Sequence, residues 1–323
     1  MVRAVVTGAG GFLGHHLAQR LKDEGYWVRG VDIKWPEFAP TPCDEFLLLD
    51  LRERDAADIA VSDMEECYAL AADMGGMGFI STHHAQILHN NALINLNTFE
   101  AAHRRHAGRV FYASSACVYP EYKQMTAGVT PNLKEEDAWP AQPQDAYGLE
   151  KLTSEELAMH YARDYGMTFR IARFHNIYGP LGTWRGGREK APAAMCRKVA
   201  VAAIQGGPVE VWGDGTATRS YCYVDDAIEG VRRLMRSDYA QPLNIGSEQA
   251  VTVNELLGTV CAVAGVEVET RYVAGPVGVL GRNSDNTRCR AVLQWEPTTS
   301  LRYGIEQTYP WIEQEVSRWL TSA

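Results

Sequence analysis

The stretch Arg3-Ala4-Val5-Val6-Thr7-Gly8-Ala9-Gly10-Gly11-Phe12-Leu13-Gly14 decides the fold of this chain. Its first half is a short apolar run, typical of a buried strand. Its second half places Gly8, Gly11 and Gly14 at the spacing G-x-x-G-x-x-G. In a dinucleotide-binding turn the first glycine permits a tight bend, the second lets the backbone approach a pyrophosphate, and the third allows a helix to pack closely. We expect that helix at His15–Glu24, with its N-terminal amides directed toward the phosphates.

Two acidic residues follow predicted strands at positions that suit the same ligand. Trp27–Val31 is expected to form the second strand, and Asp32 lies at its end. A carboxylate there can bind both ribose hydroxyls and repel a 2′-phosphate, which favours NAD over NADP. The alternative is a solvated loop acid. Phe46–Leu49 is the next predicted strand, and Asp50 at its end could reach an adenine amino group.

Strands and helices alternate through the first half of the chain. Further strands are expected at Glu66–Ala72, Arg109–Ala113 and Thr168–Ala172, and helices at Ile87–Arg104 and Tyr147–Tyr165. This alternation is typical of parallel βαβ units and predicts an α/β fold, a Rossmann-type doubly wound parallel sheet. In such a sheet the ligands bind at the carboxyl ends of the strands.

The pattern changes after Pro180. Glycine, proline and basic residues dominate from there to about Arg188, which suggests a second lobe over the cleft. We therefore expect residues 1–175 to form the NAD-binding domain. Residues 176–323 are expected to form mainly a smaller C-terminal substrate-binding lobe, with segments that return to the first domain.

Composition narrows the class of protein. The 323 residues are 46% hydrophobic and 22% charged, as in an ordinary globular enzyme, and no apolar run is long enough for a membrane span. No signal peptide is expected, and the seven cysteines lack C-x-x-C spacing, so we expect reduced thiols in a cytoplasmic protein. The formal net charge of −9 argues against nucleic acid as a partner.

A tyrosine and a lysine four residues apart indicate the chemistry. Tyr147 and Lys151 share one face of a predicted helix. The ammonium there can lie beneath the phenol and lower its pKa, so that the phenol takes a proton from an alcohol while a hydride leaves the same carbon. Ser115, after an earlier strand, can share the hydrogen bond to that oxygen. Tyr-x-x-x-Lys alone is common on helices, but here it follows a dinucleotide turn.

Other clusters have simpler explanations. His83 and His84 are adjacent and so point to different faces of a helix, and with His89 they lack an acidic partner at ligand spacing, so no metal site is expected. Tyr221–Tyr223 is expected to be a strand and not a platform for base stacking. Asp225-Asp226 is expected to cap a helix.

These motifs together resemble the extended short-chain dehydrogenase/reductase family that acts on nucleotide sugars. The shared motifs are T-G-x-x-G-x-x-G, S-S-A-x-V-Y, Y-x-x-x-K and R-x-x-N-x-Y-G-P. More specific stretches resemble the GDP-mannose 3,5-epimerase group of that family, and they cover nearly the whole chain in order. They are Ala71–Ile80, Tyr112–Pro120, Asp137–Pro140, Pro143–Lys151, Arg173–Pro180, Gly186–Ala194, Trp212–Gly215 and Gly281–Asn286.

The resemblance implies a second acid/base pair. Carbons C3 and C5 of a hexose are not acidic, but oxidation at C4 makes both α to a carbonyl. Cys117 is the candidate base, since a thiol near a cationic cofactor and a lysine can ionise near neutrality. Lys190 is the candidate acid for the opposite face. The alternatives are a small buried hydrophobe for Cys117 and an exposed loop lysine for Lys190.

The resemblance also implies binding residues. Arg219 and Arg282 suit a pyrophosphate because each guanidinium binds two oxygens at once. The expected substrate contacts are Gly75, Ser115, Cys117, Asn176, Glu189, Lys190, Ala191, Lys198, Arg219 and Arg282. The expected cofactor contacts are Gly8, Gly11, Gly14, Asp32, Asp50, Tyr147 and Lys151.

The expected function is that of an NAD-dependent nucleotide-sugar epimerase converting GDP-mannose to GDP-L-galactose and GDP-L-gulose. A 4-epimerase would need no Cys117–Lys190 pair, a dehydratase would place an acid beside the serine run, and a decarboxylase of the same family also remains open. A non-catalytic NAD-binding sensor would need no intact serine, tyrosine and lysine set.

Neither nucleic acid nor membrane is an expected partner, whereas a second copy of the chain is. Relatives in the resembled family pair two helices of each subunit into a four-helix bundle. Here those helices would be Ile87–Arg104 and Tyr147–Tyr165, with Leu93, Leu96 and Phe99 at helical spacing on the contact face.

Overall fold

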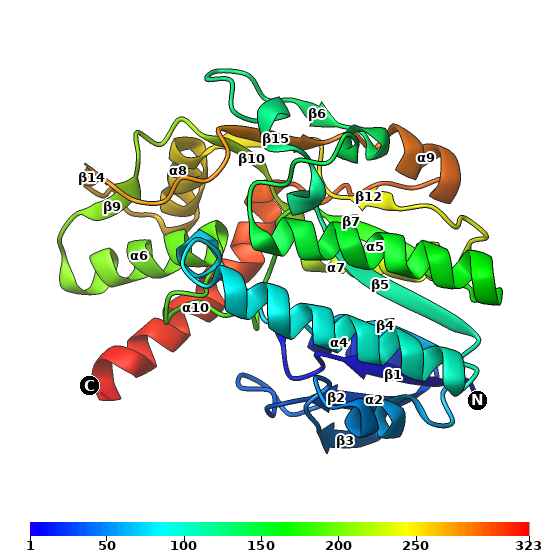
Figure 1. Cartoon of the computed structure of the whole chain (residues 1–323). Coiled ribbons are helices and arrows are strands. Elements are labelled where there is room, and N and C mark those ends of the chain that lie inside the picture. The colour runs from blue at the N-terminus through cyan, green and yellow to red at the C-terminus, as the bar shows by residue number, and fades with distance from the viewer. Residues whose placement is uncertain (323) are drawn as a thin grey trace.

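The computed structural model describes residues 1–322, and its centre is a seven-stranded parallel sheet (Figure 1). The strand order is β12-β7-β5-β4-β1-β2-β3. The strands are β1 (Arg3–Thr7), β2 (Trp27–Asp32), β3 (Glu45–Leu48), β4 (Glu66–Ala69), β5 (Arg109–Ser115), β7 (Phe169–Phe174) and β12 (Leu243–Ile245). All six pairings between neighbours are parallel. The Rossmann-type doubly wound sheet expected from the sequence is confirmed.

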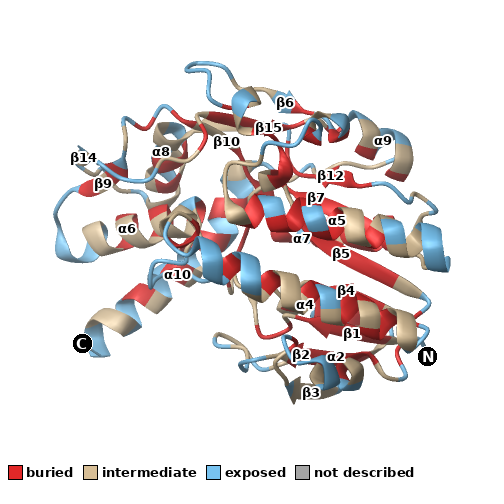
Figure 2. Cartoon of the chain, in the orientation of Figure 1, coloured by how far each residue is buried: buried red, intermediate tan, exposed pale blue. Residues whose placement is uncertain are grey.

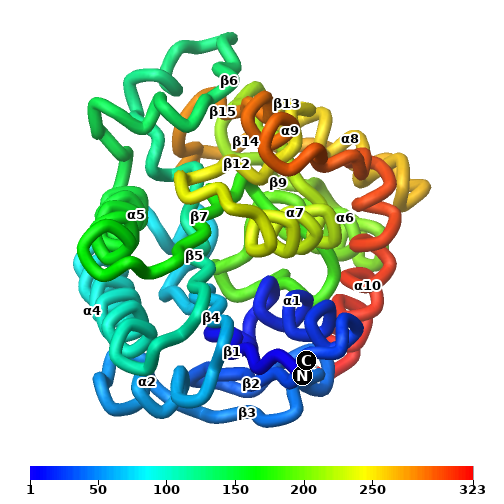
Figure 3. The backbone as a smooth tube through the Cα atoms, turned by 90° about the vertical axis from the view of Figure 1, so that its right-hand side faces the viewer, coloured from blue at the N-terminus to red at the C-terminus, as the bar shows by residue number. Residues whose placement is uncertain are grey.

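Helices cover both faces of the sheet, as the view along its edge shows (Figure 3). α1 (Phe12–Asp23) and α7 (Val224–Arg236) pack on one face, and α2 (Arg54–Val61), α4 (His84–Arg104) and α5 (Ala146–Tyr165) pack on the other. Alternate residues of one strand therefore enter two separate cores. Val5 belongs to the core under α4, whereas Ala4 and Val6 belong to the core under α1 and α7. The inner strands are almost entirely buried, whereas the edge strand β3 is partly exposed (Figure 2).

Most of the remaining elements form a second layer beyond the carboxyl ends of the strands, whereas the helix Thr287–Leu293 packs beside β12 and α7 (Figure 1). A four-stranded sheet has the order β13-β10-β15-β6, and two further pairs are β8–β11 and β9–β14. These strands are β6 (Asn132–Leu133), β8 (Ile177–Tyr178), β9 (Val209–Trp212), β10 (Thr218–Ser220), β11 (Cys222–Tyr223), β13 (Ala250–Thr252), β14 (Thr270–Val273) and β15 (Gly281–Ser284). The helices are α3 (Met77–Ile80), α6 (Ala191–Gln205), α8 (Val253–Ala264), α9 (Thr287–Leu293) and α10 (Leu301–Ser322), with short 3₁₀ turns η1 (Ala116–Val118), η2 (Glu121–Lys123) and η3 (Glu135–Ala138). None of the helices in residues 1–322 has the length and hydrophobicity of a membrane span.

Several predicted boundaries differ from the structure. The first helix begins at Phe12 and not His15, because Gly11 itself is its extended N-cap. The fourth strand ends at Ala69 and not Ala72, because the Thr7 hydroxyl accepts hydrogen bonds from the next two backbone amides at 3.1 Å and so replaces the ladder. The predicted helix cap at Asp225-Asp226 is wrong, since Tyr223 is the N-cap and both acids lie in the first turn of α7.

One residue predicted for a subunit contact lies in the interior of the chain. Phe99 is fully buried, and its ring packs edge-on against Tyr112 and Phe169, with centroids 5.3 and 5.0 Å away. It cannot belong to an exposed face of α4. Leu96 on the same helix is 47% exposed, and Leu93 is partly exposed.

Candidate active site

The glycine turn packs so closely against the protein's own backbone that side chains would not fit at two of its positions. A Cβ on Gly14 would lie 2.1 Å from the Gly8 carbonyl oxygen, so helix α1 can pack this closely only without one. Gly8 also has a φ of +75°, which favours glycine. A Cβ on Gly10 would lie 2.3 Å from the Lys34 carbonyl oxygen. Gly10 is thus a third constrained position in this turn, one that the motif spacing did not single out.

Asp32 closes this turn from the end of β2. Its carboxylate accepts a hydrogen bond from the Gly10 amide at 3.0 Å and another from the Lys34 amide at 3.2 Å. Burial raises the pKa of Asp32, and these amides partly offset that effect. A glycine turn followed by a helix N-terminus, with an acid beside it, fits the pyrophosphate and ribose of NAD. The carboxylate of Asp50, at the end of β3, is paired to Arg52 at 2.5 Å.

A cavity of about 380 Å³ opens between the strand ends and the second layer. Every residue expected to bind the substrate or to take part in hydride or proton transfer lines this cavity. They are Gly75, Ser115, Cys117, Tyr147, Lys151, Asn176, Glu189, Lys190, Ala191, Lys198, Arg219 and Arg282. These residues come from segments more than two hundred positions apart in the sequence, so the fold and not local spacing brings them together.

The first turn of helix α5 places Tyr147 next to the end of β5. Asp145 is its N-cap and accepts a hydrogen bond from the Gly148 amide at 2.8 Å. A Cβ on Gly148 would lie 2.1 Å from the Cys117 carbonyl oxygen, so the first turn of α5 rests directly on the backbone of η1. This contact fixes Tyr147 relative to Ser115 and Cys117.

Lys151 lies one turn further along α5. Its ammonium donates to the Ala113 carbonyl oxygen at 2.8 Å and lies 5.7 Å from the centroid of the Tyr147 ring. The sequence predicted a lowered pKa for the phenol of Tyr147, but in the structure burial has the largest effect on it. Burial raises the pKa of Tyr147, with Cys117 and Glu150 adding to it, and a hydrogen bond to Ser115 opposes the rise. Burial likewise lowers the pKa of Lys151.

Cys117 and Lys190 face the same cavity from different elements. The Cys117 thiol accepts a hydrogen bond from the Arg282 guanidinium at 3.4 Å, so a cationic group lies directly beside the sulfur. Lys190 is the N-cap residue of α6. Burial lowers the pKa of its ammonium, and the charge of Cys117 partly opposes this effect. The pair thus combines a candidate proton acceptor and a candidate proton donor in one space.

The cavity carries positive charge that no carboxylate neutralises directly. Arg219 and Arg282 are register partners on the parallel strands β10 and β15. Burial and the neighbouring Arg282 charge lower the pKa of Arg219 to about 10. Among residues 1–322, neither arginine has an acidic side chain at salt-bridge distance, and the same holds for the cavity lysines Lys151, Lys190 and Lys198. In a chain of net charge −9, this concentration of cations indicates an anionic ligand.

Three of the predicted contacts also hold the cavity wall in place. The Glu189 carboxylate accepts from the Gly187 amide at 2.7 Å and from Arg197 at 3.0 Å. The Lys198 ammonium donates to the Glu210 carbonyl oxygen at 2.6 Å. Asn176 has a φ of +44°, which asparagine tolerates better than most residues, and its amide donates to the Ser220 carbonyl oxygen at 3.0 Å.

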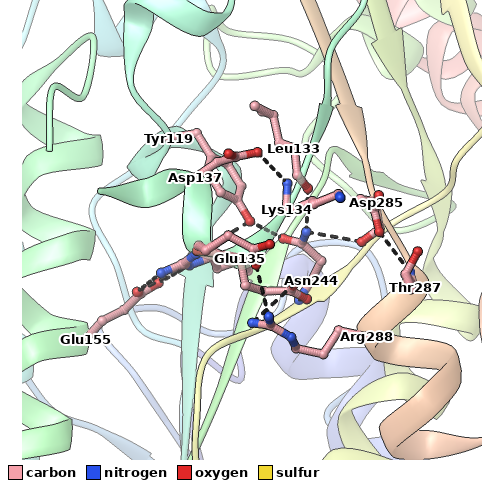
Figure 4. Close-up of polar contacts among 12 residues, drawn as sticks. Tyr119, Leu133, Lys134, Glu135, Asp137, Glu155, Asn244, Asp285, Thr287 and Arg288 are labelled. Carbon is pink, nitrogen blue, oxygen red and sulfur yellow. Dashed lines mark hydrogen bonds and ion pairs between the residues drawn. The ribbon is translucent and has the colours of Figure 1, made fainter. Parts of the chain in front are cut away.

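A buried polar network supports the site from behind (Figure 4). Glu155 lies one turn beyond Lys151 on α5 and pairs with Arg173 at 2.7 Å, with both side chains almost fully buried. Ser114, next to Ser115, donates to Glu155. Arg173 also donates to the Glu135 carbonyl oxygen at 2.6 Å. The network therefore joins the ends of β5 and β7, helix α5 and the turn η3. Ser114 and Arg173 lie in the motifs quoted above, but their spacing alone did not predict this network.

The same network continues toward β12. Asn244 donates to the Leu133 carbonyl oxygen at 2.8 Å, and its own carbonyl accepts from the Tyr119 hydroxyl at 2.6 Å. His175 lies against the same amide at 3.1 Å, and burial lowers the pKa of this histidine to about 3. His175 is therefore a neutral structural residue at physiological pH.

Comparisons with known proteins agree with this geometry. A family model described as the NAD dependent epimerase/dehydratase family matches residues 4–246. The chain is 49% identical over 319 residues to GDP-mannose 3,5-epimerase 1 of Oryza sativa subsp. indica, covering 98% of this chain and 83% of the rice protein. It is 49% identical over 316 residues to the GDP-mannose 3,5-epimerase of Arabidopsis thaliana, covering 97% and 82%.

Among solved structures, the chain is similar to the UDP-glucose 4-epimerase of Thermotoga maritima. The TM-score is 0.87 at 24% identity, over 98% of this chain and 100% of that one. This likeness shows the fold alone.

Proposed function

The chain belongs to the NAD dependent epimerase/dehydratase family, and we propose that it is a GDP-mannose 3,5-epimerase, converting GDP-mannose to GDP-L-galactose and GDP-L-gulose. The observation that carries the proposal is one cavity holding two sets of groups. Ser115, Tyr147 and Lys151 suit oxidation of an alcohol, and Cys117 with Lys190 suits proton exchange at carbon. The identity of 49% to two named 3,5-epimerases supports the choice of substrate.

Ser115, Tyr147 and Lys151 act in the first step, oxidation at C4, and in the last step, reduction at C4. Bound NAD supplies the acceptor for the hydride that leaves C4 of the hexose. Tyr147, as the phenolate, takes the proton of the C4 hydroxyl to become the phenol and returns that proton at the end, and Ser115 holds the substrate oxygen by a hydrogen bond. The Ala113 carbonyl oxygen holds the Lys151 ammonium beside the Tyr147 ring, where its charge can stabilise the phenolate form as the proton moves.

The second set acts while C4 is a ketone. The C3 and C5 protons are then α to a carbonyl and can be removed. Cys117 takes one of them from one face of the ring, helped by the Arg282 contact at 3.4 Å. Lys190 returns a proton from the opposite face, and its pKa, lowered by burial, eases that transfer.

The remaining cations bind the charged part of the substrate. Arg219 and Lys198 offer donors to the diphosphate, and the Asn176 amide offers a hydrogen bond to the sugar or a diphosphate oxygen. The turn with Gly8, Gly11 and Gly14 would hold the pyrophosphate of NAD, and Asp32, which accepts from the Gly10 amide, would bind its ribose hydroxyls. Residues 1–175 would thus hold the cofactor and the hydride-transfer residues, and residues 176–323 would form mainly the substrate-binding lobe, with segments such as β12 that return to the first domain.

We further propose a cytoplasmic homodimer formed through α4 and α5. These helices pack against each other within one chain and expose apolar side chains. Leu96 and Leu149 are 47% and 48% exposed, and Leu88 and Tyr165 are exposed as well. A light-scattering mass of two chains that drops to one in a Leu96→Glu, Leu149→Glu variant is the expected result. A single-chain mass for the native protein would contradict this assembly.

Product analysis across substrates tests the function. The protein is incubated with GDP-mannose, UDP-glucose and UDP-glucuronic acid, and the sugar products are identified by NMR. The expected result is inversion of GDP-mannose at C5 and C3 without net change at C4. Inversion at C4 of any of these sugars would identify a 4-epimerase instead, loss of the glucuronic carboxylate a decarboxylase, and binding of NAD with no turnover a sensor.

A further inference from the structure

A contact between two loops spans the cavity close to Lys190. One loop, residues 73–80, follows β4 and contains α3, and the other, residues 186–190, precedes α6. The Gly76 amide donates to the Arg188 carbonyl oxygen at 2.9 Å. A Cβ on Gly76 would lie 2.2 Å from the Glu189 carbonyl oxygen, so the two backbones are in direct contact.

The side chain of Arg188 reinforces this contact. Its guanidinium donates to the Asp73 carboxylate at 2.9 Å and to the Met74 carbonyl oxygen at 3.2 Å. Its central carbon lies 3.7 Å from the centroid of the Phe79 ring, within cation–π range. Arg188 therefore attaches to the first loop at three points, by charge, by hydrogen bond and by stacking.

The first loop is in turn held against the catalytic residues. Phe79 and Ile80 form one apolar cluster with Ile87 and Tyr147, and Cys117 packs against it. Asp73 is held by Gln86 and Asn90 of α4 at 2.8 and 2.9 Å. The loop 73–80 is therefore held in place by packing and hydrogen bonds, and Arg188 binds the loop 186–190 to it.

Lys190 lies two residues beyond Arg188, in a segment that is bound to the rest of the protein by the side chains of Arg188 and Glu189. On one side, Glu189 binds Arg197 of α6 at 3.0 Å and so ties the segment to its own helix. On the other side, Arg188 ties it to the loop that packs on Tyr147 and Cys117. Arg188 does not belong to the described residues that line the cavity, and its side chain is 45% exposed. It acts on the reaction only through the placement of its neighbours.

We propose that Arg188 is a positioning residue that sets the reach of Lys190 across the cavity relative to Cys117. This inference rests on the proposed function, because it assumes that Lys190 and Cys117 exchange protons at carbon. Oxidation at C4 depends on Ser115, Tyr147 and Lys151, to none of which Arg188 makes a hydrogen bond. Loss of Arg188 should therefore slow exchange at C3 and C5 while oxidation at C4 continues.

The test compares Arg188→Ala with a matched control, Arg185→Ala. Arg185 lies in the same segment and also stacks on aromatic rings, but on Trp184 and Trp319, outside the cavity. For each variant and the native protein, three quantities are measured with GDP-mannose in deuterated water. They are transient formation of the reduced cofactor, deuterium at C3 and C5, and the thermal midpoint of unfolding.

We expect Arg188→Ala to lose about tenfold or more in the rate of deuterium incorporation, since a displacement of ~1 Å can cost ~10²-fold. Cofactor reduction and the thermal midpoint should stay close to those of the native protein, because exposed ion pairs contribute little to stability. Arg188→Lys keeps the charge and loses the planar fork, so its rate of deuterium incorporation should lie between those of Arg188→Ala and the native protein. Hydrogen exchange at the Gly76 amide should rise in Arg188→Ala only.

The outcomes separate the two claims. If the native protein incorporates no deuterium at C3 or C5, the proposed function fails, and the role of Arg188 fails with it. If the native protein exchanges but both alanine variants match it, only the role of Arg188 is refuted. Equal losses of oxidation and exchange in Arg188→Ala, together with a lower thermal midpoint, would refute positioning as well, since they would mark a merely structural residue.

Discussion

Replacing Gly148 with alanine should damage the active site by a predictable route. The added Cβ would lie 2.1 Å from the Cys117 carbonyl oxygen and 2.8 Å from its carbonyl carbon. Carbon–oxygen contacts settle at ~3.3 Å or more, so α5 and η1 must separate by roughly 1 Å. Both contacts are backbone atoms, so no side chain can rotate to make room. Tyr147, next to Gly148, would move away from Ser115 and Cys117 as the helix retreats.

The expected magnitudes follow from this displacement. Overpacking of a tight site costs about 1–3 kcal/mol of unfolding free energy. A shift of ~1 Å between reacting groups can lower the rate by ~10²-fold. The rate should therefore suffer much more than the stability, and the variant should remain folded, since whole domains have ~5–15 kcal/mol available.

A second helical glycine provides the control. Gly258 lies on the exposed side of α8, and a Cβ there would have no atom within 4 Å. Gly258→Ala should leave turnover unchanged and raise stability by up to ~1 kcal/mol through helix propensity. The assays are turnover of GDP-mannose and unfolding in urea. If Gly148→Ala turns over at the native rate, the contact between α5 and η1 does not position Tyr147, and this reasoning is refuted.

Three further outcomes are expected. Tyr147→Phe should abolish or severely slow turnover yet bind NAD normally by calorimetry, because only the hydroxyl is lost; near-native turnover would remove Tyr147 from the mechanism. Arg173→Met should cost about 3–5 kcal/mol in urea unfolding, since it leaves Glu155 charged and unpaired in the interior, and an added Glu155→Leu should restore much of that loss; a loss below ~1 kcal/mol would contradict this account of the network. Burial raises the pKa of Asp73, but hydrogen bonds from Gln86, Asn90 and Arg188 outweigh burial, so the net pKa is lowered. The ionised Asp73 therefore adds to the free energy of unfolding above the unfolded pKa of ~3.9, and this stabilisation disappears as the pH falls through the lower folded pKa. Asp73→Asn should therefore unfold at lower urea than the native protein at neutral pH, and that gap should close in acid; a gap independent of pH would count against the ion pair.

The features predicted correctly from the sequence depend on local geometry. Gly8, Gly11 and Gly14 form one tight turn, so their spacing alone indicates strand, turn and helix. Tyr147 and Lys151 share a helix face because they are four residues apart. The predicted strands were found within a few residues of their limits because alternation of apolar runs with helices determines the parallel sheet.

The features that escaped prediction depend on contacts between distant segments. Phe99 has the spacing of a surface residue, yet it is buried because α4 turns that side toward Tyr112. Gly76 is confined by Glu189, more than a hundred residues later, and no local pattern marks it. The raised pKa of Tyr147 likewise follows from burial in the assembled cleft and not from its spacing to Lys151.

The incorporation of solvent deuterium into GDP-mannose tests the central claim most directly. The native protein and Cys117→Ala are incubated with NAD in deuterated water, and the label at C3, C4 and C5 is located by NMR and mass spectrometry. The account predicts deuterium at C5 and C3 with the native protein, none at C4, and little label at any carbon with Cys117→Ala, which should still reduce the cofactor transiently. Inversion at C4 without label at C3 or C5, or undiminished labelling by Cys117→Ala, would contradict it.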